Sequence, residues 1–327
     1  MNTSSQSNHH DSNLNWQELT KPLEELKDCT VCPRECHANR TTDNLGFCQS
    51  TADFPVASIS VHKGEEPPIS GKNGICNIFF SHCNMQCIYC QNHQISDNAS
   101  PLPYKKNDLM GIIQKIDNIL ERGIHTVGFV SASHFIPQMR IIIDVLKTRK
   151  HDVVFVFNTN SYDKKETIQK FDGVMNVYLP DLKYMDDDLA KRYSNTPNYT
   201  QIATTAIKEM FRQKGTEIKF GAEGNIQSGL IIRHLVLPGE VENSKKALRF
   251  IVKELSTSIH ISLMAQYYPT PKVKNHPYLG RTLKPEEYEE VLEEFERLGF
   301  HRGWTQKLDS SDHYRPDFSS EHPFKNN

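Results

Sequence analysis

Short apolar runs alternate with longer stretches of helical pattern from Ile75 to Ala265. The runs are rich in β-branched and aromatic residues and almost continuously hydrophobic, as strands are when both faces of their sheet are covered. This alternation predicts βα units around a parallel sheet. The expected strands are Ile75–Phe80, Ile124–Val130, Val153–Phe157, Val174–Leu179, Leu230–Leu237 and Ile259–Ala265.

Amphipathic helices are expected between and after these strands. Residues 107–122 and 244–255 carry apolar side chains at helical spacing. Residues 284–298 predict a further helix, because Pro285 and acidic residues fill its first turn and Gly299 follows its end. Strands and helices of this kind form either an open doubly wound sheet or an incomplete barrel, and periodicity does not distinguish the two.

Length and charge limit the class of protein. At 327 residues the chain suits a single α/β barrel of roughly 200 to 250 residues with appendages. Lys and Arg total 38 against 40 Asp and Glu, so no net field favours nucleic acid or an anionic membrane. No apolar stretch approaches the roughly 20 residues that span a bilayer, and the N-terminus has no signal-peptide pattern. We therefore expect a soluble, cytoplasmic protein that binds neither nucleic acid nor membrane.

Composition divides the chain into four expected parts. Residues 1–20 are polar and predict a disordered tail, and residues 21–70 form a cysteine-rich segment. Residues 71–270 hold the expected strands, and residues 271–327 form a C-terminal extension that begins with a helix. Beyond Trp304 the extension is polar and is expected to be loose.

All eight cysteines lie between Cys29 and Cys90, which in a reducing cytosol indicates metal ligands or reactive thiols rather than disulfides. Cys83, Cys87 and Cys90 directly follow the first expected strand, at the end where barrels place their chemistry. A four-iron cube normally takes four cysteines, so three leave one iron open for a substrate or cofactor. The alternatives are a zinc site completed by a nearby histidine, His82 or His93, and inert buried thiols.

A second group of four cysteines lies within twenty residues of the N-terminal segment: Cys29, Cys32, Cys36 and Cys48. Four thiols at this spacing suit a closed zinc site or a second iron-sulfur cluster, and unligated thiols are the alternative. Cys76 is expected to be a buried core residue. Glu65 and Glu66, in the Pro-rich loop before the first expected strand, are expected to be solvated, with contact to a substrate or a basic partner as the alternative.

The segment from Cys83 to Cys90 resembles the radical S-adenosylmethionine (SAM) superfamily, whose hallmark is three cysteines at this spacing with an aromatic residue, here Tyr89, before the third. The resemblance implies an α/β fold, a partial (β/α)6 TIM-like barrel. It also implies a 4Fe-4S cluster on the three cysteines and SAM as cofactor, whose methionyl group chelates the open iron. Electron transfer from the reduced cluster then yields a 5'-deoxyadenosyl radical that abstracts hydrogen. An electron donor such as flavodoxin or ferredoxin is a further implied partner.

From Cys29 to about Pro271 the chain is most similar to activases of glycyl-radical enzymes, such as the pyruvate formate-lyase activating enzyme, and to poorly characterised relatives of it. Asp181 and Lys183 match the activases' Asp-x-Lys motif, in which the lysine contacts the methionyl carboxylate. The likeness adds Asn158, Arg233 and the aromatic Tyr89 as expected cofactor contacts, although Asn158 replaces an aspartate. Ordinary turns and caps are the alternative interpretation of these loop residues.

One element of the superfamily pattern is missing. Ser131, Ala132, Ser133 and His134 stand where the superfamily usually has Gly-Gly-Glu, so the residue that receives the methionyl amino group is not identified. Three functions remain open: hydrogen abstraction from a partner protein, as in glycyl-radical activation; a radical reaction on a small molecule or peptide; and a zinc-binding structural or interaction protein.

Overall fold

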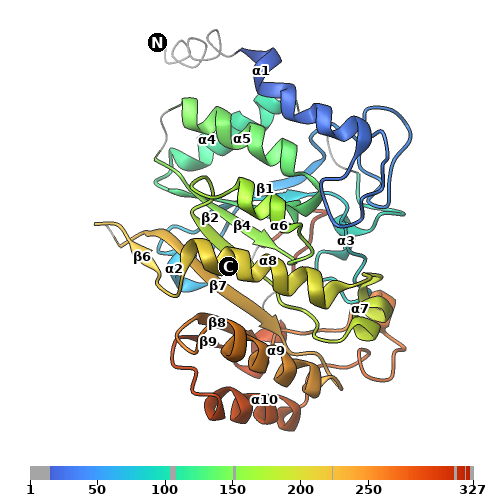
Figure 1. The fold of residues 1–327 in the computed structure, drawn as a ribbon, viewed down its shortest axis with the longest axis vertical. Helices are drawn as coiled ribbons and strands as arrows, with labels where there is room; N and C mark the ends of the chain where they lie inside the picture. Colours follow the sequence, from blue (N-terminus) through green and yellow to red (C-terminus); the bar gives the residue numbers. More distant parts are fainter. Residues whose placement is uncertain are drawn as a thin grey trace.

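The computed structural model describes residues 15–103, 108–149, 152–222, 224–312, 315–320 and 322–324. At its centre is a nine-stranded sheet in the order β1-β2-β3-β4-β5-β7-β8-β9, with β6 paired to β7 outside this path (Figure 1). The pairs from β2 to β9 are parallel, whereas β1 and β6 are antiparallel to their partners. The strands are β1 (Val56–His62), β2 (Ile75–Phe80), β3 (Thr126–Val130), β4 (Val154–Thr159), β5 (Val177–Pro180), β6 (Lys219–Phe220), β7 (Ile226–Leu235), β8 (His260–Met264) and β9 (Gly303–Thr305).

Helices cover the outside of this sheet, with α4 and α5 at one end of the molecule and α9 and α10 at the other (Figure 1). The α-helices are α1 (Trp16–Thr20), α2 (Pro67–Ser70), α3 (His93–Ser96), α4 (Leu109–Leu120), α5 (Ile136–Thr148), α6 (Lys165–Lys170), α7 (Asp187–Ser194), α8 (Tyr199–Lys214), α9 (Val241–Glu254) and α10 (Pro285–Arg297). Short 3-10 helices are η3 (Lys21–Asp28), η4 (Ala132–His134), η5 (Pro271–Val273) and η6 (Leu308–Asp312).

The strand order decides between the two architectures that the sequence left open. The parallel strands are neighbours in the order in which they occur in the chain, as in a barrel wall, whereas a doubly wound sheet reverses its order at a switch point. The α/β partial barrel is therefore confirmed. The six expected strands correspond to β2, β3, β4, β5, β7 and β8, and the three expected helices to α4, α9 and α10. The antiparallel β1, the hairpin strand β6 and the short β9 were not expected.

Side chains that alternate along each strand pack in two different hydrophobic cores, one outside and one inside the barrel. Outward-facing residues such as Cys76 and Ile78 pack with apolar residues of the covering helices. Inward-facing residues of the lower strand ends form a small separate cluster with Ile69 of α2: Ile75, Val154, Val156, Val177, Leu179, Ile226 and Ile231. This cluster closes the amino end of the barrel. Other inward positions are polar: Asn77, Asn158 and Arg233, on three different strands, all form hydrogen bonds with Glu65.

The C-terminal segment is packed, contrary to the expectation of a loose tail. The rings of Phe318 and Phe324 lie 5.2 Å and 5.6 Å from that of Phe79 on β2. Phe324 also contacts His62, with 4.3 Å between ring centroids. These aromatic contacts bury apolar surface and hold residues near the C-terminus against the interior of the sheet.

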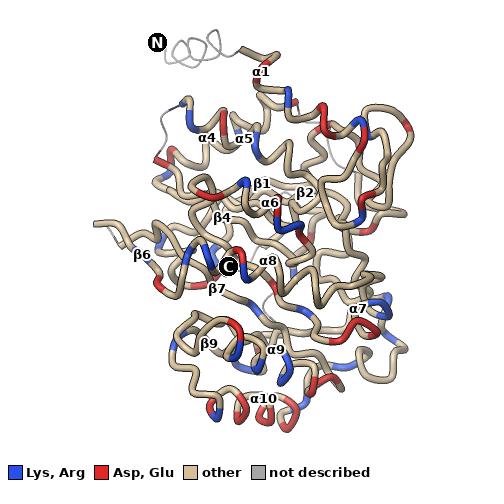
Figure 2. Tube along the Cα trace, viewed as in Figure 1, with Lys and Arg blue, Asp and Glu red and all other residues tan. Residues whose placement is uncertain are grey.

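The N-terminal tail is only partly described. Residues 1–14 of the expected disordered segment lie outside the described residues, and α1 occupies its last five. Acidic and basic residues are interspersed over the fold, with a concentration of acidic residues on α10 (Figure 2). No helix in the described ranges is both long and apolar enough to cross a membrane.

Gly128 provides a test of the inward packing. A Cβ at this position of β3 would lie 2.1 Å from Oδ1 of Asn77, its partner on β2. We expect Gly128→Ala to lower the free energy of unfolding by about 1–3 kcal/mol, measured by chemical denaturation, because overpacking forces neighbouring groups from their positions. The double substitution of Gly128→Ala with Asn77→Ala removes the clashing amide and should recover part of the loss. A Gly128→Ala variant as stable as the wild type would contradict this packing.

Candidate active site

A cavity of about 190 Å³ lies at the carboxyl ends of the parallel strands, and Cys83, Cys87 and Cys90 line it together. The loop after β2 carries all three thiols. Cys83 is buried, and Cys87 and Cys90 are half-buried. The order of strand, loop and short helix brings the three sulfurs to one cavity wall, where a ligand can reach them.

Each of the three sulfurs accepts a hydrogen bond from the protein. The backbone N–H of Met85 donates to Cys83 Sγ at 3.3 Å, Ser194 Oγ to Cys87 Sγ at 2.9 Å, and Ser96 Oγ to Cys90 Sγ at 3.2 Å. Such donors stabilise thiolate charge and tune a metal centre. No sequence pattern predicts the role of Ser194, because this residue reaches the cysteine loop from the end of α7.

The donor set suits an iron-sulfur cluster. Cysteine thiolates are the usual ligands of iron-sulfur clusters, and this loop offers three thiols and no carboxylate. The hydrogen bonds to all three sulfurs stabilise their thiolate form. Burial raises the pKa of the Cys87 thiol to about 11, although Lys183 opposes the shift, so metal binding must displace the thiol proton. His93, one of the expected alternative ligands, directs its Nδ1 toward the carbonyl of Cys90 at 3.2 Å. In a 4Fe-4S cube each cysteine binds a different iron, so the three sulfurs need not meet at one ion. Within the described ranges no group of three or more Cys, His, Asp or Glu is arranged around the position of a single metal ion.

A chain of hydroxyl groups links Tyr89 to the cysteines. The Tyr89 and Tyr184 hydroxyls are 2.6 Å apart, and Tyr184 is in turn 2.6 Å from Ser194 Oγ, which donates to Cys87. Burial raises the pKa of both phenols well above the ordinary range. Tyr89 therefore remains a neutral, fixed wall of the cavity beside the cysteine loop.

Asp181 is the centre of a largely buried ionic network in the same cavity as the cysteines. Its two oxygens accept separate hydrogen bonds, from Lys183 Nζ at 2.7 Å and from Arg233 Nε at 2.7 Å. Burial alone would raise the pKa of Asp181, but Arg233 and Lys183 outweigh it and hold that pKa below its usual value. Burial opposes the charge of Lys183 likewise, and Asp181 reverses the effect, so the pKa of Lys183 is raised. Both cations are thus held charged in the cavity wall.

Arg233 extends the network to two further elements. Its Nη2 donates to Asn158 Oδ1 at 2.6 Å, and its Nη1 lies 3.2 Å from Glu65 Oε2. His234, the next residue, faces outward and contacts the Leu182 carbonyl and Ser244 Oγ, as the alternation of a strand requires. Asn158 stands in this network as a hydrogen-bonding group between Arg233 and Glu65.

The structure brings the five expected cofactor contacts, Tyr89, Asn158, Asp181, Lys183 and Arg233, to the same cavity as the three cysteines. Ser131 also lines this cavity, in a left-handed conformation with φ of 55°. The expectation of solvated Glu65 and Glu66 was wrong. Both side chains are 8% exposed and line the cavity, because Ile69 anchors the loop within the inner apolar cluster.

The four N-terminal cysteines line a second, separate cavity of about 10 Å³. Its wall is formed by Cys29, Cys32, Cys36, Cys48, Arg34, Arg40 and His134. Burial raises the pKa of the Cys32 thiol to about 12, and the other three cysteines add to the shift. The two ring nitrogens of His134 are buried without a hydrogen-bond partner among the described residues.

Arg34 connects the N-terminal cysteine segment to the cysteine loop of the active site. Its Nε donates to the carbonyl of Asn84 at 2.9 Å, and its Nη2 to that of Asn195 at 2.5 Å. The guanidinium lies 3.6 Å from the centroid of the Phe47 ring, a cation–π distance. The side-chain amide of Asn98 adds a second link by donating to the carbonyls of Phe47 and Cys83. The N-terminal segment therefore supports the loop from behind.

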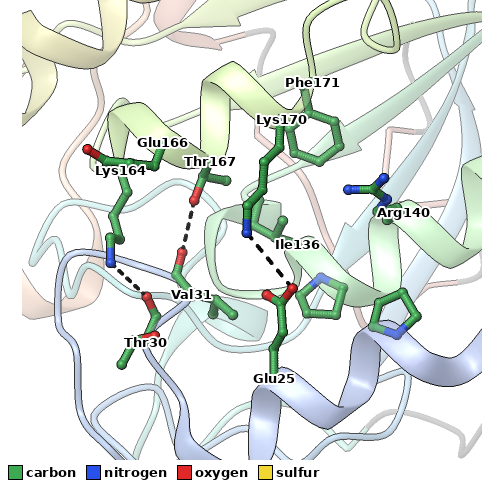
Figure 3. Close-up of a pocket in the computed structure, with 12 residues that line it drawn as sticks. Glu25, Thr30, Val31, Ile136, Arg140, Lys164, Glu166, Thr167, Lys170 and Phe171 are labelled. Atoms are coloured by element: carbon green, nitrogen blue, oxygen red, sulfur yellow. Dashed lines mark hydrogen bonds and ion pairs between the residues drawn. The ribbon is translucent and has the colours of Figure 1, made fainter.

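The same segment is attached to α6 across a cleft that both polar and apolar side chains line (Figure 3). Lys164 Nζ lies 2.6 Å from Glu35 Oε1 and donates to the carbonyl of Thr30. Thr167 Oγ1 donates to the carbonyl of Val31 at 3.4 Å, as Figure 3 shows. Lys164, together with Lys170 through its ion pair with Glu25 at 3.9 Å, thus holds the N-terminal segment to the barrel.

Asp181→Asn tests the buried network. We expect a loss of about 3 kcal/mol in the free energy of unfolding near neutral pH, because Lys183 and Arg233 lose their shared carboxylate. Since the folded-state pKa of Asp181 is lowered, its stabilisation is present above the unfolded pKa of about 3.9 and fades as the pH falls through the folded value. The difference between wild type and variant should therefore shrink in acid.

The matched control for this prediction is Asp28→Asn. Asp28 pairs with His37 at the surface, with 71% of its side chain exposed, so its loss should change stability by less than about 1 kcal/mol. Urea denaturation across the acidic range measures both variants. A similar, small effect at the two positions would contradict the central role of Asp181.

The family model described as "Radical SAM superfamily" matches residues 77–251. An uncharacterized protein of Methanocaldococcus jannaschii is 30% identical over 279 residues, which cover 82% of this chain and 74% of that protein.

Solved structures show more distant likenesses. A domain of pyruvate-formate lyase-activating enzyme from Bacteroides vulgatus is 17% identical, with a TM-score of 0.37 over 53% of this chain and 93% of that one. Streptococcus suis SuiB bound to S-adenosylmethionine is 13% identical, with a TM-score of 0.46 over 69% and 48% of the two chains. The FeFe-hydrogenase maturase HydG from Carboxydothermus hydrogenoformans is 12% identical, with a TM-score of 0.48 over 71% and 53%. These values are too low to indicate a shared function.

Proposed function

The chain belongs to the radical SAM superfamily, and on that premise we propose that it cleaves SAM at a 4Fe-4S cluster held by Cys83, Cys87 and Cys90 and abstracts hydrogen from a substrate. Family membership implies both cofactors. The observation that carries the residue assignment is the single cavity that the three thiols share with Lys183 and Arg233. When bound and reduced, the cluster supplies one electron to the sulfonium of SAM, which releases a 5'-deoxyadenosyl radical.

The cavity residues have separate roles in this proposal. Lys183 is the partner of the methionyl carboxylate, since its ammonium is buried, charged and held by Asp181 on the wall that faces the cysteines. Asp181 and Arg233 orient that ammonium. Ser96 and Ser194 stabilise thiolate charge through their hydrogen bonds to sulfur. Tyr89 and the aromatic residues of the C-terminal segment limit the access of water to the reacting groups.

The substrate that we propose is a small molecule. The cavity measures about 190 Å³, and Pro316 and Phe324 of the C-terminal segment form part of its wall. A loop of a partner protein could enter only after displacement of this segment, whose aromatic rings are packed against Phe79 and His62. Hydrogen abstraction from a peptide, including activation of a glycyl-radical enzyme, is the alternative. A purely structural zinc-binding role does not agree with membership of the superfamily.

The reaction also requires a source of electrons. Because the cluster must be reduced once for each irreversible SAM cleavage, we propose a one-electron donor of the flavodoxin or ferredoxin class as a partner. A thiolate-ligated cluster with an open iron is preserved in a reducing compartment, so a cytoplasmic location is part of this proposal.

Substitution of the three loop cysteines tests the reaction. After anaerobic reconstitution and dithionite reduction, the wild type should contain iron and sulfide and should release 5'-deoxyadenosine from SAM. Cys83→Ala, Cys87→Ala and Cys90→Ala should each lose most of this cleavage, because a cube that lacks a protein ligand is not retained in a reactive state. Cys76→Ala is the matched control, since Cys76 is buried in the outer core. Retained cluster and cleavage in all three loop variants would refute the assignment.

For the N-terminal segment, residues 21–70, we propose a second metal site on Cys29, Cys32, Cys36 and Cys48. Four thiols around one small cavity are a donor set for zinc or for a second iron-sulfur cluster. Metal binding would draw the thiols together and hold Arg34 in its position behind the active-site loop. The site is thus structural in this proposal, and β1 links the segment to the barrel sheet.

Metal analysis of a Cys32→Ser variant tests this second site. The wild type should contain either one zinc ion or more iron than the loop cysteines bind. The Cys32→Ser variant should lose this metal and should unfold at a lower temperature. The Cys87→Ala variant is the reciprocal control, because it should lose loop-bound iron and keep the second metal. An unchanged metal content in Cys32→Ser would refute the proposal.

A further inference from the structure

Two acidic residues form the floor of the active-site cavity and have no role in SAM cleavage as proposed. Glu65 and Glu66 lie between β1 and α2, and both line the cavity with Cys83 and Lys183. The chain enters the barrel here because Ile69 of α2 packs in the inner apolar cluster. Both carboxylates are therefore held inside the barrel, beneath the site of radical chemistry.

Glu65 is fully engaged by the protein. Its Oε1 accepts hydrogen bonds from Asn77 Nδ2 at 3.0 Å and Asn158 Nδ2 at 3.3 Å, and its Oε2 faces Arg233 Nη1 at 3.2 Å. Arg233 in turn shares its charge with Asp181. The cations of the cavity wall thus already have carboxylate partners, and Lys183 is committed to Asp181 and the methionyl carboxylate.

Glu66 differs from its neighbour. It is 8% exposed, and its Oε2 is buried without a hydrogen-bond partner among the described residues. Burial raises the pKa of Glu66 to about 7, although the charge of Arg233 and a hydrogen bond with the Ser262 hydroxyl oppose the shift. His62, which lines the same part of the cavity, also has an unpartnered Nδ1, and burial lowers its pKa. A neutral His62 ring supplies no positive charge to Glu66. The unpartnered Oε2 atom of Glu66 is therefore costly to bury, and a hydrogen-bond donor that enters the cavity would stabilise it.

We propose that Glu66 binds a cationic nitrogen, an ammonium or guanidinium group, of the substrate. This assignment rests on the proposed function and adds the chemical class of the substrate, a small amine. A charge-assisted hydrogen bond from such a group would satisfy Oε2 and neutralise the buried carboxylate. Glu65 is a positioning residue, because it ties the loop to Asn77 and Arg233 and so fixes the place of Glu66.

The amino group of SAM is a less suitable occupant. His62, at the end of β1, pairs with Ile75 at the amino end of β2, whereas Cys83 follows the carboxyl end of that strand. Five strand steps separate these ends by about 16 Å. Saturation with SAM fills the site of its methionyl amino group, so cation binding measured in its presence reports a second molecule.

A ligand-free measurement is the first test. Glu66→Gln keeps the shape of the side chain and removes its charge, so at about pH 8 it should raise the thermal midpoint by about 2 °C, since an unsatisfied binding group destabilises the fold that holds it. The raised pKa means that wild-type stability falls as the pH rises from about 4.3 to about 7. The gap between Glu66→Gln and wild type should therefore narrow at about pH 5. Glu65→Gln is the matched control and should lower the midpoint, because Glu65 has partners. A lower midpoint in Glu66→Gln at about pH 8 would assign it a structural role and overturn the proposal.

The second test measures binding directly in the cluster-loaded protein with saturating SAM, so that the site of the methionyl amino group is already filled. Putrescine and agmatine are the cationic probes, and butanediol and succinate are their neutral and anionic counterparts, all by isothermal titration calorimetry. The wild type should bind at least one cationic probe and neither counterpart, and Glu66→Gln should weaken that binding by about tenfold or more. Absence of cationic binding in the wild type, or equal affinity in Glu66→Gln, would overturn the proposal.

Formation of 5'-deoxyadenosine by the wild type, measured in the same preparation, separates this inference from the proposed function. Cation binding that depends on Glu66 without SAM cleavage would refute the reaction and leave the binding site intact. SAM cleavage without such binding would refute the cationic substrate alone.

Discussion

The shared carboxylate of Asp181 is the interaction on which the arrangement of the cavity depends. It accepts hydrogen bonds from Lys183, two residues further along the chain, and from Arg233 on β7. Arg233 then reaches Asn158 at the end of β4 and Glu65 below it. Because these groups are buried, each charge needs its partners in place, and the network fixes the relative positions of three strands and one loop.

The loop that carries Cys83, Cys87 and Cys90 is held from several directions. Serine hydroxyls from α3 and α7 reach two of its sulfurs, and Arg34 binds the carbonyl of Asn84 within it. These contacts come from segments far apart in sequence. These contacts, together with the backbone of the loop, fix the orientation of the three sulfurs.

The cavity has opposite chemical character at its two ends. Thiols and a lysine ammonium surround the upper part, whereas the floor carries two carboxylates above an apolar plug. Such a separation of charge orients a molecule that has an anionic or sulfonium-bearing part near the cysteines and a cationic part below. Pro316 and Phe324 of the C-terminal segment complete the wall, so the cavity is shaped by the strand ends together with a segment that follows the barrel in sequence.

The sequence by itself determined the βα alternation, the three loop cysteines with Tyr89, and Asp181 with Lys183. The strands and the cysteine loop follow from strand propensity and ligand spacing among residues close in sequence, whereas Asp181 and Lys183 were predicted through the resemblance to activases of glycyl-radical enzymes. Only the tertiary structure decided that Ser96 and Ser194 donate to sulfur, that the C-terminal segment packs on Phe79, and that Glu65 and Glu66 are buried. Each of these outcomes depends on contacts with remote segments. The Pro-rich loop of Glu65 looks like a solvated turn until Ile69, anchored among inward residues of distant strands, draws it into the barrel.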